Sequence, residues 1–450
     1  MPKIGGISMS LIKRLEEINV DKKANKPNER EVDPYYELKM KIQNRVIEEL
    51  DIDFNEISEN NEELKQKIDY IVSKHIEKES LNMTNSHKKK IKEELLDEII
   101  GFGPITGLLS DNNVTEIMVN GPDHVYIEKN GKLILTDAKF KNDNHVLHVI
   151  KKIVSPIGRR IDESSPMVDA RLPNGSRVNA IIPPLAIDGP SITIRKFAED
   201  PFKIEDLIRF GTLNSNMGAL IKNCVEGRLN IVVSGGTGSG KTTTLNVLSS
   251  FIPNDERIVT IEDAAELQLS QEHVVRLETR PVNVEGKGEV TIRDLVKNSL
   301  RMRPDRIIIG EVRSGEALDM LQAMNTGHDG SLTTGHANTP RDMLSRIETM
   351  VLMSGMNLPI KAIRDQVASA IDIIVQQSRL MDGSRRITHI TEVQGMEGDV
   401  IILQDIFRFE QKGLDNNGKV KGEFVSTGIM PKFVQKLKDK GINIPPDLFK

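Results

Sequence analysis

The sequence has almost no cysteine, no tryptophan and no long apolar run. Cys224 is the only cysteine in 450 residues, so one chain can form neither a disulfide framework nor a cysteine-rich zinc site. No stretch approaches the roughly 18 apolar residues of a membrane-spanning helix, and residues 1–20 lack the apolar core of a signal peptide. We therefore expect a chain that stays in a reducing cytoplasm and does not span a membrane.

A large excess of charge of one sign is also missing. The net charge is −5, with 28% charged and 38% apolar residues. This balance is typical of folded proteins and argues against nonspecific binding of nucleic acid as the main role, although a local basic stripe stays open. A chain of this length usually folds as roughly two to four domains.

The N-terminal part of the chain is polar and then helical. Residues 1–34 are charge-rich and predict a flexible arm. Apolar residues then recur at helical spacing in three stretches, which predicts three amphipathic helices in a helical domain at 35–100. The stretches are Leu38, Ile42, Val46 and Leu50; Leu64, Ile68, Ile71 and Val72; and Ile91, Leu95, Leu96, Ile99 and Ile100. The mixed Glu and Lys faces of these helices indicate solvated surface, with a docking surface as the alternative.

Short strands follow, and they predict a mixed α/β domain at 101–200. Turn signals around Gly131 and Gly175 separate apolar runs and predict two hairpins, with a helix at 145–154 and a further strand at 191–194. Residues 201–212 are polar, contain Pro and Gly, and indicate a linker.

From residue 213 to 450 apolar strands and helices alternate, which predicts an α/β domain with a mainly parallel sheet. The predicted strands are 231–234, 258–262, 274–277, 307–309, 332–334 and 371–375. Strand-like segments at 388–409 and a short helix at 431–440 end the domain.

A phosphate-binding loop is the most specific motif. Its residues are Gly235, Gly236, Thr237, Gly238, Ser239, Gly240, Lys241, Thr242 and Thr243. The loop leaves an apolar strand and enters a helix, so that backbone N–H groups and the helix N-terminus face a phosphate. Lys241 would reach the terminal phosphates, and the Thr242 hydroxyl would ligate Mg²⁺. A plain Gly/Ser turn, the alternative, needs neither side chain, so we expect a nucleoside triphosphate site.

Hydrolysis also needs a carboxylate near the nucleotide, and two candidates follow. Glu262 in IVTIEDAAEL and Glu311 in RIIIGEVR each end an apolar strand, where ligands of parallel sheets bind. Each could act as general base or hold metal through water, and each could instead cap a helix. His336 in LTTGHAN could contact or sense the γ-phosphate, or be structural. His328 is a weaker candidate.

The motifs GGTGSGKTT, TIEDAAEL, RIIIGEVR and GSLTTGHAN stand in one order. This order resembles the secretion and type IV pilus motor ATPase superfamily, with its Walker A, Asp box, Walker B and His box, over roughly residues 100–410. Passages such as TVTEIMVNGPDHVYIEKNGKL resemble the CpaF-type ATPases of tight adherence pili. Pilus-extension and type II secretion ATPases usually carry a four-cysteine zinc motif, and retraction and type IV secretion ATPases usually lack the N-terminal helical unit.

The resemblance implies a RecA-like ATPase domain at 213–450 that hydrolyses ATP with Mg²⁺. Lys241 and Thr242 would bind the triphosphate and the metal. Glu311 would act on the water, Glu262 would assist at the metal and water, and His336 would contact or sense the γ-phosphate.

The resemblance also implies that the middle domain at 101–200 is PAS-like and brings arginines to the nucleotide. Arg177 in GSRVNA and Arg195 in SITIRKF match these positions, where guanidinium groups would stabilise charge on the γ oxygens. Whether they act in their own chain or in a neighbour stays open. Arg276 and Arg280 are further candidates, with surface pairing as the alternative.

The implied assembly is a homohexameric ring at the cytoplasmic face of the membrane. It would associate peripherally, dock on an integral membrane platform protein and move pilin subunits. The alternatives are a related secretion or DNA-transfer ATPase, and a nonhydrolysing ATP-dependent switch or scaffold. Cargo, direction of motion, firing order and the partner of the helical domain stay open.

Overall fold

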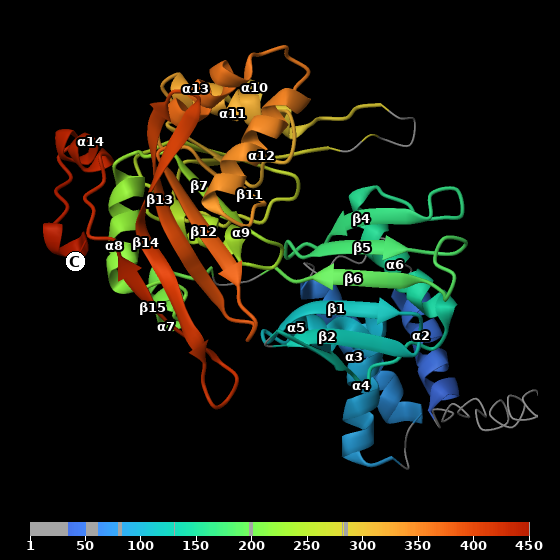
Figure 1. The fold of residues 1–450 in the computed structure, drawn as a ribbon. Helices are drawn as coiled ribbons and strands as arrows, with labels where there is room; N and C mark the ends of the chain where they lie inside the picture. The colour runs from blue at the N-terminus through green and yellow to red at the C-terminus, as the bar shows by residue number, and fades with distance from the viewer. Residues whose placement is uncertain are drawn as a thin grey trace, which may run out of the picture. The chain divides into compact units, whose positions relative to one another are not determined.

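The computed structural model describes residues 35–50, 62–79, 83–129, 131–197, 201–280, 282 and 287–449 (Figure 1). The arm predicted at 1–34 lies outside these residues. The chain divides into two compact units, Met1–Phe197 and Ala198–Lys450, each of which is considered by itself. The predicted α/β class, with N-terminal helices, a mixed middle part and a mainly parallel C-terminal sheet, is confirmed.

Three helices open the described part of the first unit, as predicted. They are α2 (Tyr36–Leu50), α3 (Glu62–Glu79) and α4 (Asn85–Ile99). Their apolar positions form one core, whose buried residues are Ile42, Val46, Ile68, Val72, Ile76, Ile91, Leu95 and Ile99. Thr84 caps α4, because its side chain accepts the N–H of His87. The helical period in the sequence therefore describes a small bundle.

A six-stranded antiparallel sheet forms the rest of the first unit, in the order β3-β2-β1-β6-β5-β4. The elements are η2 (Gly103–Ile105), α5 (Thr106–Ser110), β1 (Val114–Asn120), β2 (His124–Lys129), β3 (Lys132–Leu135), α6 (Asp143–Val154), η3 (Ser155–Ile157), β4 (Met167–Arg171), β5 (Arg177–Ile181) and β6 (Ser191–Arg195). Both predicted hairpins are confirmed, as β2–β3 and β4–β5. Helix α6 packs on one face of the sheet through an apolar core.

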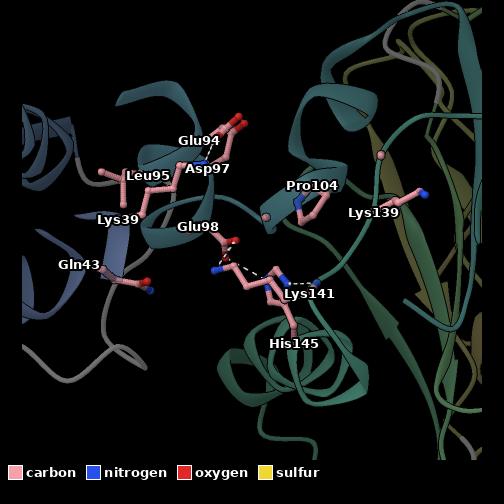
Figure 2. A pocket seen from close by; sticks show the side chains of 12 residues that line it. Lys39, Gln43, Glu94, Leu95, Asp97, Glu98, Pro104, Lys139, Lys141 and His145 are labelled. Atoms are coloured by element: carbon pink, nitrogen blue, oxygen red, sulfur yellow. Dashed lines mark hydrogen bonds and ion pairs between the residues drawn. The ribbon is translucent and has the colours of Figure 1, made fainter. Parts of the chain in front are cut away.

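The end of α4 is fastened to α6 by charged groups (Figure 2). Lys152 donates to the carbonyl oxygens of Glu98, Ile99 and Gly101 at 3.2, 2.8 and 2.7 Å. The first two are carbonyls that a helix end leaves without intrahelical partners, and a cation there also suits the helix dipole. The Glu98 carboxylate lies 2.9 Å from His145 Nε2 and 3.2 Å from Lys141 Nζ. A cavity of about 420 Å³ lies beside this contact.

A nine-stranded sheet in the order β15-β14-β13-β12-β7-β11-β10-β8-β9 organises the second unit. Pairing is parallel from β12 to β9 and antiparallel from β12 to β15. Its strands are β7 (Ile231–Gly235), β8 (Ile258–Glu262), β9 (Val274–Glu278), β10 (Arg306–Ile309), β11 (Leu332–Gly335), β12 (Ile373–Arg379), β13 (Arg385–Glu397), β14 (Val400–Leu414) and β15 (Val420–Ser426). The strands predicted at 231–375 are all present.

Helices cover both faces of this sheet (Figure 1). They are α7 (Ile204–Arg209), α8 (Ser215–Glu226), α9 (Lys241–Ser249), α10 (Ile292–Ser299), α11 (Glu316–Asn325), α12 (Pro340–Met353), α13 (Ile360–Ala370), α14 (Phe433–Asp439) and η4 (Pro446–Phe449). Ile231 and Val233 face the core under α8 and α9, whereas Val232 faces the core under α10 to α13. This double burial explains the continuous apolar run of β7.

The segment predicted as a linker at 201–212 carries α7, whose Leu207 is buried in the core of the second unit. The segments predicted as strand-like at 388–409 belong to the long strands β13 and β14. The edge strand β15 has no counterpart among the predicted elements. Its residues are exposed or half-exposed and only Val420, Phe424 and Val425 are apolar, so the sequence carries little apolar signal there.

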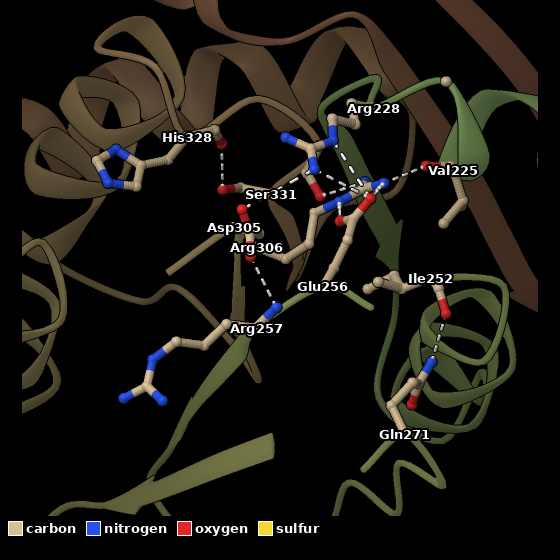
Figure 3. Close-up of polar contacts among 12 residues, drawn as sticks. Val225, Arg228, Ile252, Glu256, Arg257, Gln271, Asp305, Arg306, His328 and Ser331 are labelled. Atoms are coloured by element: carbon tan, nitrogen blue, oxygen red, sulfur yellow. Dashed lines mark hydrogen bonds and ion pairs between the residues drawn. The ribbon is translucent and has the colours of Figure 1, made fainter. Parts of the chain in front are cut away.

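A buried ion pair holds the amino ends of the parallel strands together (Figure 3). Arg306, at the start of β10, is fully buried and pairs with Glu256, which precedes β8. The same guanidinium donates to the carbonyls of Gly330 and Val225 at 3.1 and 2.8 Å. Arg228 adds a second guanidinium 3.2 Å from Glu256. Such a network is costly to break on one side, because it leaves a buried charge without its partner.

We predict that Arg306→Met lowers the free energy of unfolding of the second unit by about 3–5 kcal/mol. The substitution fills a similar volume but leaves the Glu256 carboxylate with Arg228 as its remaining cationic partner and two carbonyls without their donor. Urea denaturation measures the change. The control is Lys361→Gln, which removes an exposed pair with Asp399 and should cost less than about 1 kcal/mol. Equal effects of the two substitutions would contradict the prediction.

Candidate functional site

The loop between β7 and α9 has the backbone that its glycines require. Gly238 and Gly240 lie in the left-handed region, with φ of +70° and +95°. A Cβ on Gly235 would lie 2.3 Å from the carbonyl oxygen of Gln377 on β12. Ser239 donates to the carbonyl of Gly236 at 2.8 Å and closes the loop on itself. The loop is therefore formed as a tight turn between a buried strand and the first residue of a helix.

Lys241 begins α9 and turns its amine back over the loop. It is 7% exposed, and its Nζ donates to the carbonyl of Gly236 at 3.2 Å. The two ring nitrogens of His336 lie 3.4 and 3.5 Å from the same Nζ. Burial lowers the pKa of Lys241, while the nearby Glu311 carboxylate acts in the opposite direction. The structure thus gathers Lys241, His336 and Glu311, three of the residues predicted from separate motifs.

Glu311 lies at the centre of a charge cluster just beyond β10. Its Oε1 is 2.9 Å from His336 Nε2, and its Oε2 accepts a hydrogen bond of 3.1 Å from Arg313. Arg313 also approaches Asp263 at 3.2 Å and so links the ends of β10 and β8. His336 follows β11, which pairs with β10 in parallel. The cluster therefore arises because neighbouring parallel strands end at one edge of the sheet.

The cluster sets the protonation states of its members. Burial alone would raise the pKa of the Glu311 carboxyl, but Arg313, His336 and Lys241 together hold it below its usual range. Burial lowers the pKa of His336, and the neighbouring Lys241 lowers it further. At neutral pH the site thus holds an ionised carboxylate beside a neutral imidazole, which donates one hydrogen bond from its protonated nitrogen and accepts one at the other.

Glu262 ends β8 and is almost completely buried. Its Oε2 accepts the backbone N–H groups of Glu266 and Leu267 at 2.7 and 3.0 Å. A Cβ on Gly310 would lie 2.9 Å from its Cγ, so the side chain lies against the end of β10. Glu262 is therefore close to the cluster, while one of its oxygens fixes the loop after β8.

The two predicted arginines of the first unit stand side by side on its sheet. Arg177 on β5 and Arg195 on β6 are direct partners in the register, and both are exposed. Asp169 lies 3.8 Å from Arg177, and Glu116 lies 3.8 Å from Arg195. Two like charges directly opposite each other disfavour the strand pair. An anion between the two guanidinium groups would remove that cost.

The weaker candidates lie elsewhere. His328 precedes β11 and therefore lies at the amino end of the strand whose carboxyl end carries His336. Figure 3 shows it beside the Arg306 network. Arg276 is exposed on the edge strand β9, and Arg280 donates to the carbonyl of Gly288 within its own loop.

Two residues that contribute to the site, Arg313 and Gln377, were not predicted from the sequence. Gln377 is buried on β12 and accepts a hydrogen bond of 2.6 Å from Thr244 of α9, which braces the phosphate-binding loop from β12. The sequence offers only weak signals for them. One is an arginine two residues after Glu311, and the other is a pair of glutamines that ends the apolar run IIVQQ.

Comparisons with known proteins match the part of the chain that carries these residues. Residues 98–401 match a family model described as type II/IV secretion system protein. The putative conjugal transfer protein Rv3659c of Mycobacterium tuberculosis is 36% identical over 312 residues, 68% of this chain and 88% of that protein. The conjugal transfer protein TrbB of Rhizobium radiobacter is 34% identical over 291 residues, 64% and 86% of the two chains.

Among solved structures, the VirB11 ATPase of the Brucella suis type IV secretion system, in complex with sulphate, is 30% identical. The match covers 64% of this chain and 91% of that chain, with a TM-score of 0.36.

We predict that Arg313→Gln moves the acid limb of the pH profile of phosphate release from ATP to higher pH. Loss of the guanidinium raises the pKa of Glu311, and an ionised base is lost as the pH falls through its pKa. The measurement is kcat/KM for ATP from about pH 3.5 to about pH 8, which includes the region below the usual pKa of a glutamate. Arg301→Gln, at an exposed position, is the control, and an unmoved acid limb in Arg313→Gln would contradict the prediction.

Proposed function

The chain belongs to the type II/IV secretion system protein family and is a P-loop ATPase, and from this premise we propose that it is a motor for pilus assembly. The observation that carries the proposal is the convergence of Lys241, Glu311 and His336 at the phosphate-binding loop. A protein that only held nucleotide would need the loop and its lysine. The ionised carboxylate beside them is the group that hydrolysis needs in addition.

The loop amides and Lys241 would bind the β- and γ-phosphates. On binding, a phosphate oxygen would replace the carbonyl of Gly236 as the acceptor of the Lys241 amine. Glu311 would accept a proton from the attacking water or orient it toward the γ-phosphorus. His336, placed between Lys241 and Glu311, would contact the γ-phosphate and register its loss.

The residues present fit a magnesium ion held mainly by the nucleotide. Thr242 and Glu262 are the oxygen donors predicted for it, and Mg²⁺ in such sites keeps one or two protein ligands besides phosphate oxygens and water. No cluster of three His, Cys, Asp or Glu ligands occurs in the described ranges, and a site of this kind needs none. When bound, the ion would neutralise charge on the β- and γ-phosphate oxygens.

Arg177 and Arg195 would supply further positive charge to the γ-phosphate. Their facing positions on β5 and β6 support this role, since two guanidinium groups side by side suit an anion of high charge. A site completed by the sheet of the first unit fits a ring of identical chains, and we propose a homohexamer. Heterologous contacts that close into a ring would let one hydrolysis event reorient the next site.

We propose that this motor powers a tight adherence pilus at the cytoplasmic face of the membrane. The passages that resemble CpaF-type ATPases and the N-terminal helical bundle support this cargo. Within the described ranges, no helix is long and apolar enough to cross a membrane. We therefore propose peripheral association through an integral platform protein.

DNA transfer is the second candidate, because two relatives are named conjugal transfer proteins. The net charge of −5 speaks against direct contact with nucleic acid. DNA that stimulates hydrolysis with a steep salt dependence would favour this candidate over the pilus.

We predict that Lys241→Ala and Glu311→Gln each reduce steady-state phosphate release by about 100-fold or more. Lys241→Ala should also weaken ATP binding, whereas Glu311→Gln should keep it, since the amide preserves the shape of the side chain. Turnover, ATP affinity and pilus assembly in complemented cells are the three readouts. Wild-type turnover in Glu311→Gln would overturn the assigned role, and absent turnover in the wild type would leave a switch or scaffold.

A mixed-chain experiment tests the arginines. We expect Arg177→Gln and Arg195→Gln each to lower kcat at least about tenfold, because each loses one charge-assisted contact to the γ-phosphate. If they act on a neighbouring chain, mixing Arg195→Gln with Lys241→Ala restores part of the activity. Normal kcat in both arginine variants would contradict the role.

A further inference from the structure

Two arginines stand opposite each other at the turn end of the β12–β13 hairpin. Arg379, the last residue of β12, and Arg385, the first of β13, are direct partners in the register. Both side chains are exposed. Like charges directly opposite each other are unfavourable in an antiparallel pair. Asp382, in the turn between them, accepts from Ser384 and from the N–H of Val420.

Both arginines reach the phosphate-binding loop. Arg385 Nε donates to the carbonyl of Gly238 at 3.0 Å, and a Cβ on Gly240 would lie 3.1 Å from Arg385 Cδ. A Cβ on Gly238 would lie 3.7 Å from Nη1 of Arg379. In the described part of the chain the Arg379 guanidinium has no hydrogen bond or ion pair. Two guanidinium groups with free N–H donors therefore lie against the loop.

The sheet order places these arginines on a defined side of the loop. Strand β7, which leads into the loop, has β11 on one side and β12 on the other. His336 follows β11 and Glu311 follows the next strand, β10, so the groups for hydrolysis all lie on the β11 side. The γ-phosphate must lie there, within reach of Glu311. The β12 side of the loop then faces the other end of the phosphate chain.

We propose that Arg379 and Arg385 bind the α- and β-phosphates of the nucleotide in the same chain that supplies the loop. This deepens the proposed ATPase function and rests on it. Arg385, anchored through Nε on the loop, presents its remaining N–H donors, and Arg379 presents a whole guanidinium fork, which matches phosphate oxygens. The adjacent Arg386 serves as a contrast, since it donates to the carbonyl of Phe210 at 2.9 Å.

Contacts to the α- and β-phosphates exist with ATP and with ADP alike. They stabilise bound substrate and transition state equally, so they lower KM and Kd without raising kcat. They also slow the release of ADP. The pair thus differs in kinetic signature from Arg177 and Arg195, whose proposed contacts to the γ-phosphate act on kcat.

The experiment compares Arg379→Gln, Arg385→Gln and the double variant with Arg408→Gln in the full-length protein. Arg408 is an exposed arginine on β14 that pairs with Glu410 and serves as the control. Kd values for ATP and ADP at low salt are measured by displacement of a fluorescent ADP analogue, and kcat by phosphate release. We expect each single substitution to raise both Kd values by about tenfold. The double variant should show a larger rise, with kcat within about twofold of wild type.

Three outcomes overturn the proposal. They are unchanged Kd values in the double variant, weaker binding of ATP but not of ADP, and a fall in kcat at saturating ATP as the main effect. Loss of the Gly238 contact could disturb the loop in Arg385→Gln, so Arg379→Gln, which breaks no contact, must show the effect as well. ADP binding is measured without turnover, so a wild-type protein that binds ADP through this pair and does not hydrolyse ATP would overturn the ATPase function alone.

Discussion

Parallel hydrogen bonding among β7, β11, β10 and β8 brings four strand ends to one edge of the second unit's sheet. Lys241, His336, Glu311 and Glu262 follow those ends, although up to 95 residues separate them in the chain. The distances among their side chains follow from strand register. A shift of one residue in any of these pairings would turn a strand's side chains to the opposite face and disperse the cluster. The relative positions of the reactive side chains are therefore determined by the register of the sheet.

The same sheet keeps its main electrostatic anchor at the opposite edge. Arg306 and Glu256 join the amino ends of β10 and β8, far along the strands from Glu311. A buried, fully bonded ion pair is rigid, whereas His336 and Arg313 at the carboxyl edge are partly exposed and can exchange partners when a phosphate arrives. The rigid ion pair and the reactive side chains thus lie at different ends of one set of strands. A substitution at one end should therefore have little effect on the other.

Local patterns were sufficient to predict the strands between residues 231 and 375, the three N-terminal helices and the phosphate-binding loop, because each is specified by periodicity or by glycine conformation. The rule that ligands collect at the carboxyl ends of parallel strands was enough to select Glu311 and His336. The sequence did not predict Arg313 or Gln377. Their partners Asp263 and Thr244 are distant in the sequence and become neighbours only in the folded chain. Helix α7 was not predicted either, because its segment carries several charged residues and Leu207 is the one residue of the helix that is buried.

The hydrogen bonds that Lys152 donates at the end of α4 have a mechanical consequence. Three hydrogen bonds and the Glu98–His145 contact join the bundle to α6, and α6 is packed on the sheet that carries Arg177 and Arg195. A tilt of that sheet would therefore carry the bundle with it as a lever arm. Helix α3, with 18 residues, is about 27 Å long. A rotation of about ten degrees would displace its far end by roughly 5 Å, a stroke close to one helical turn.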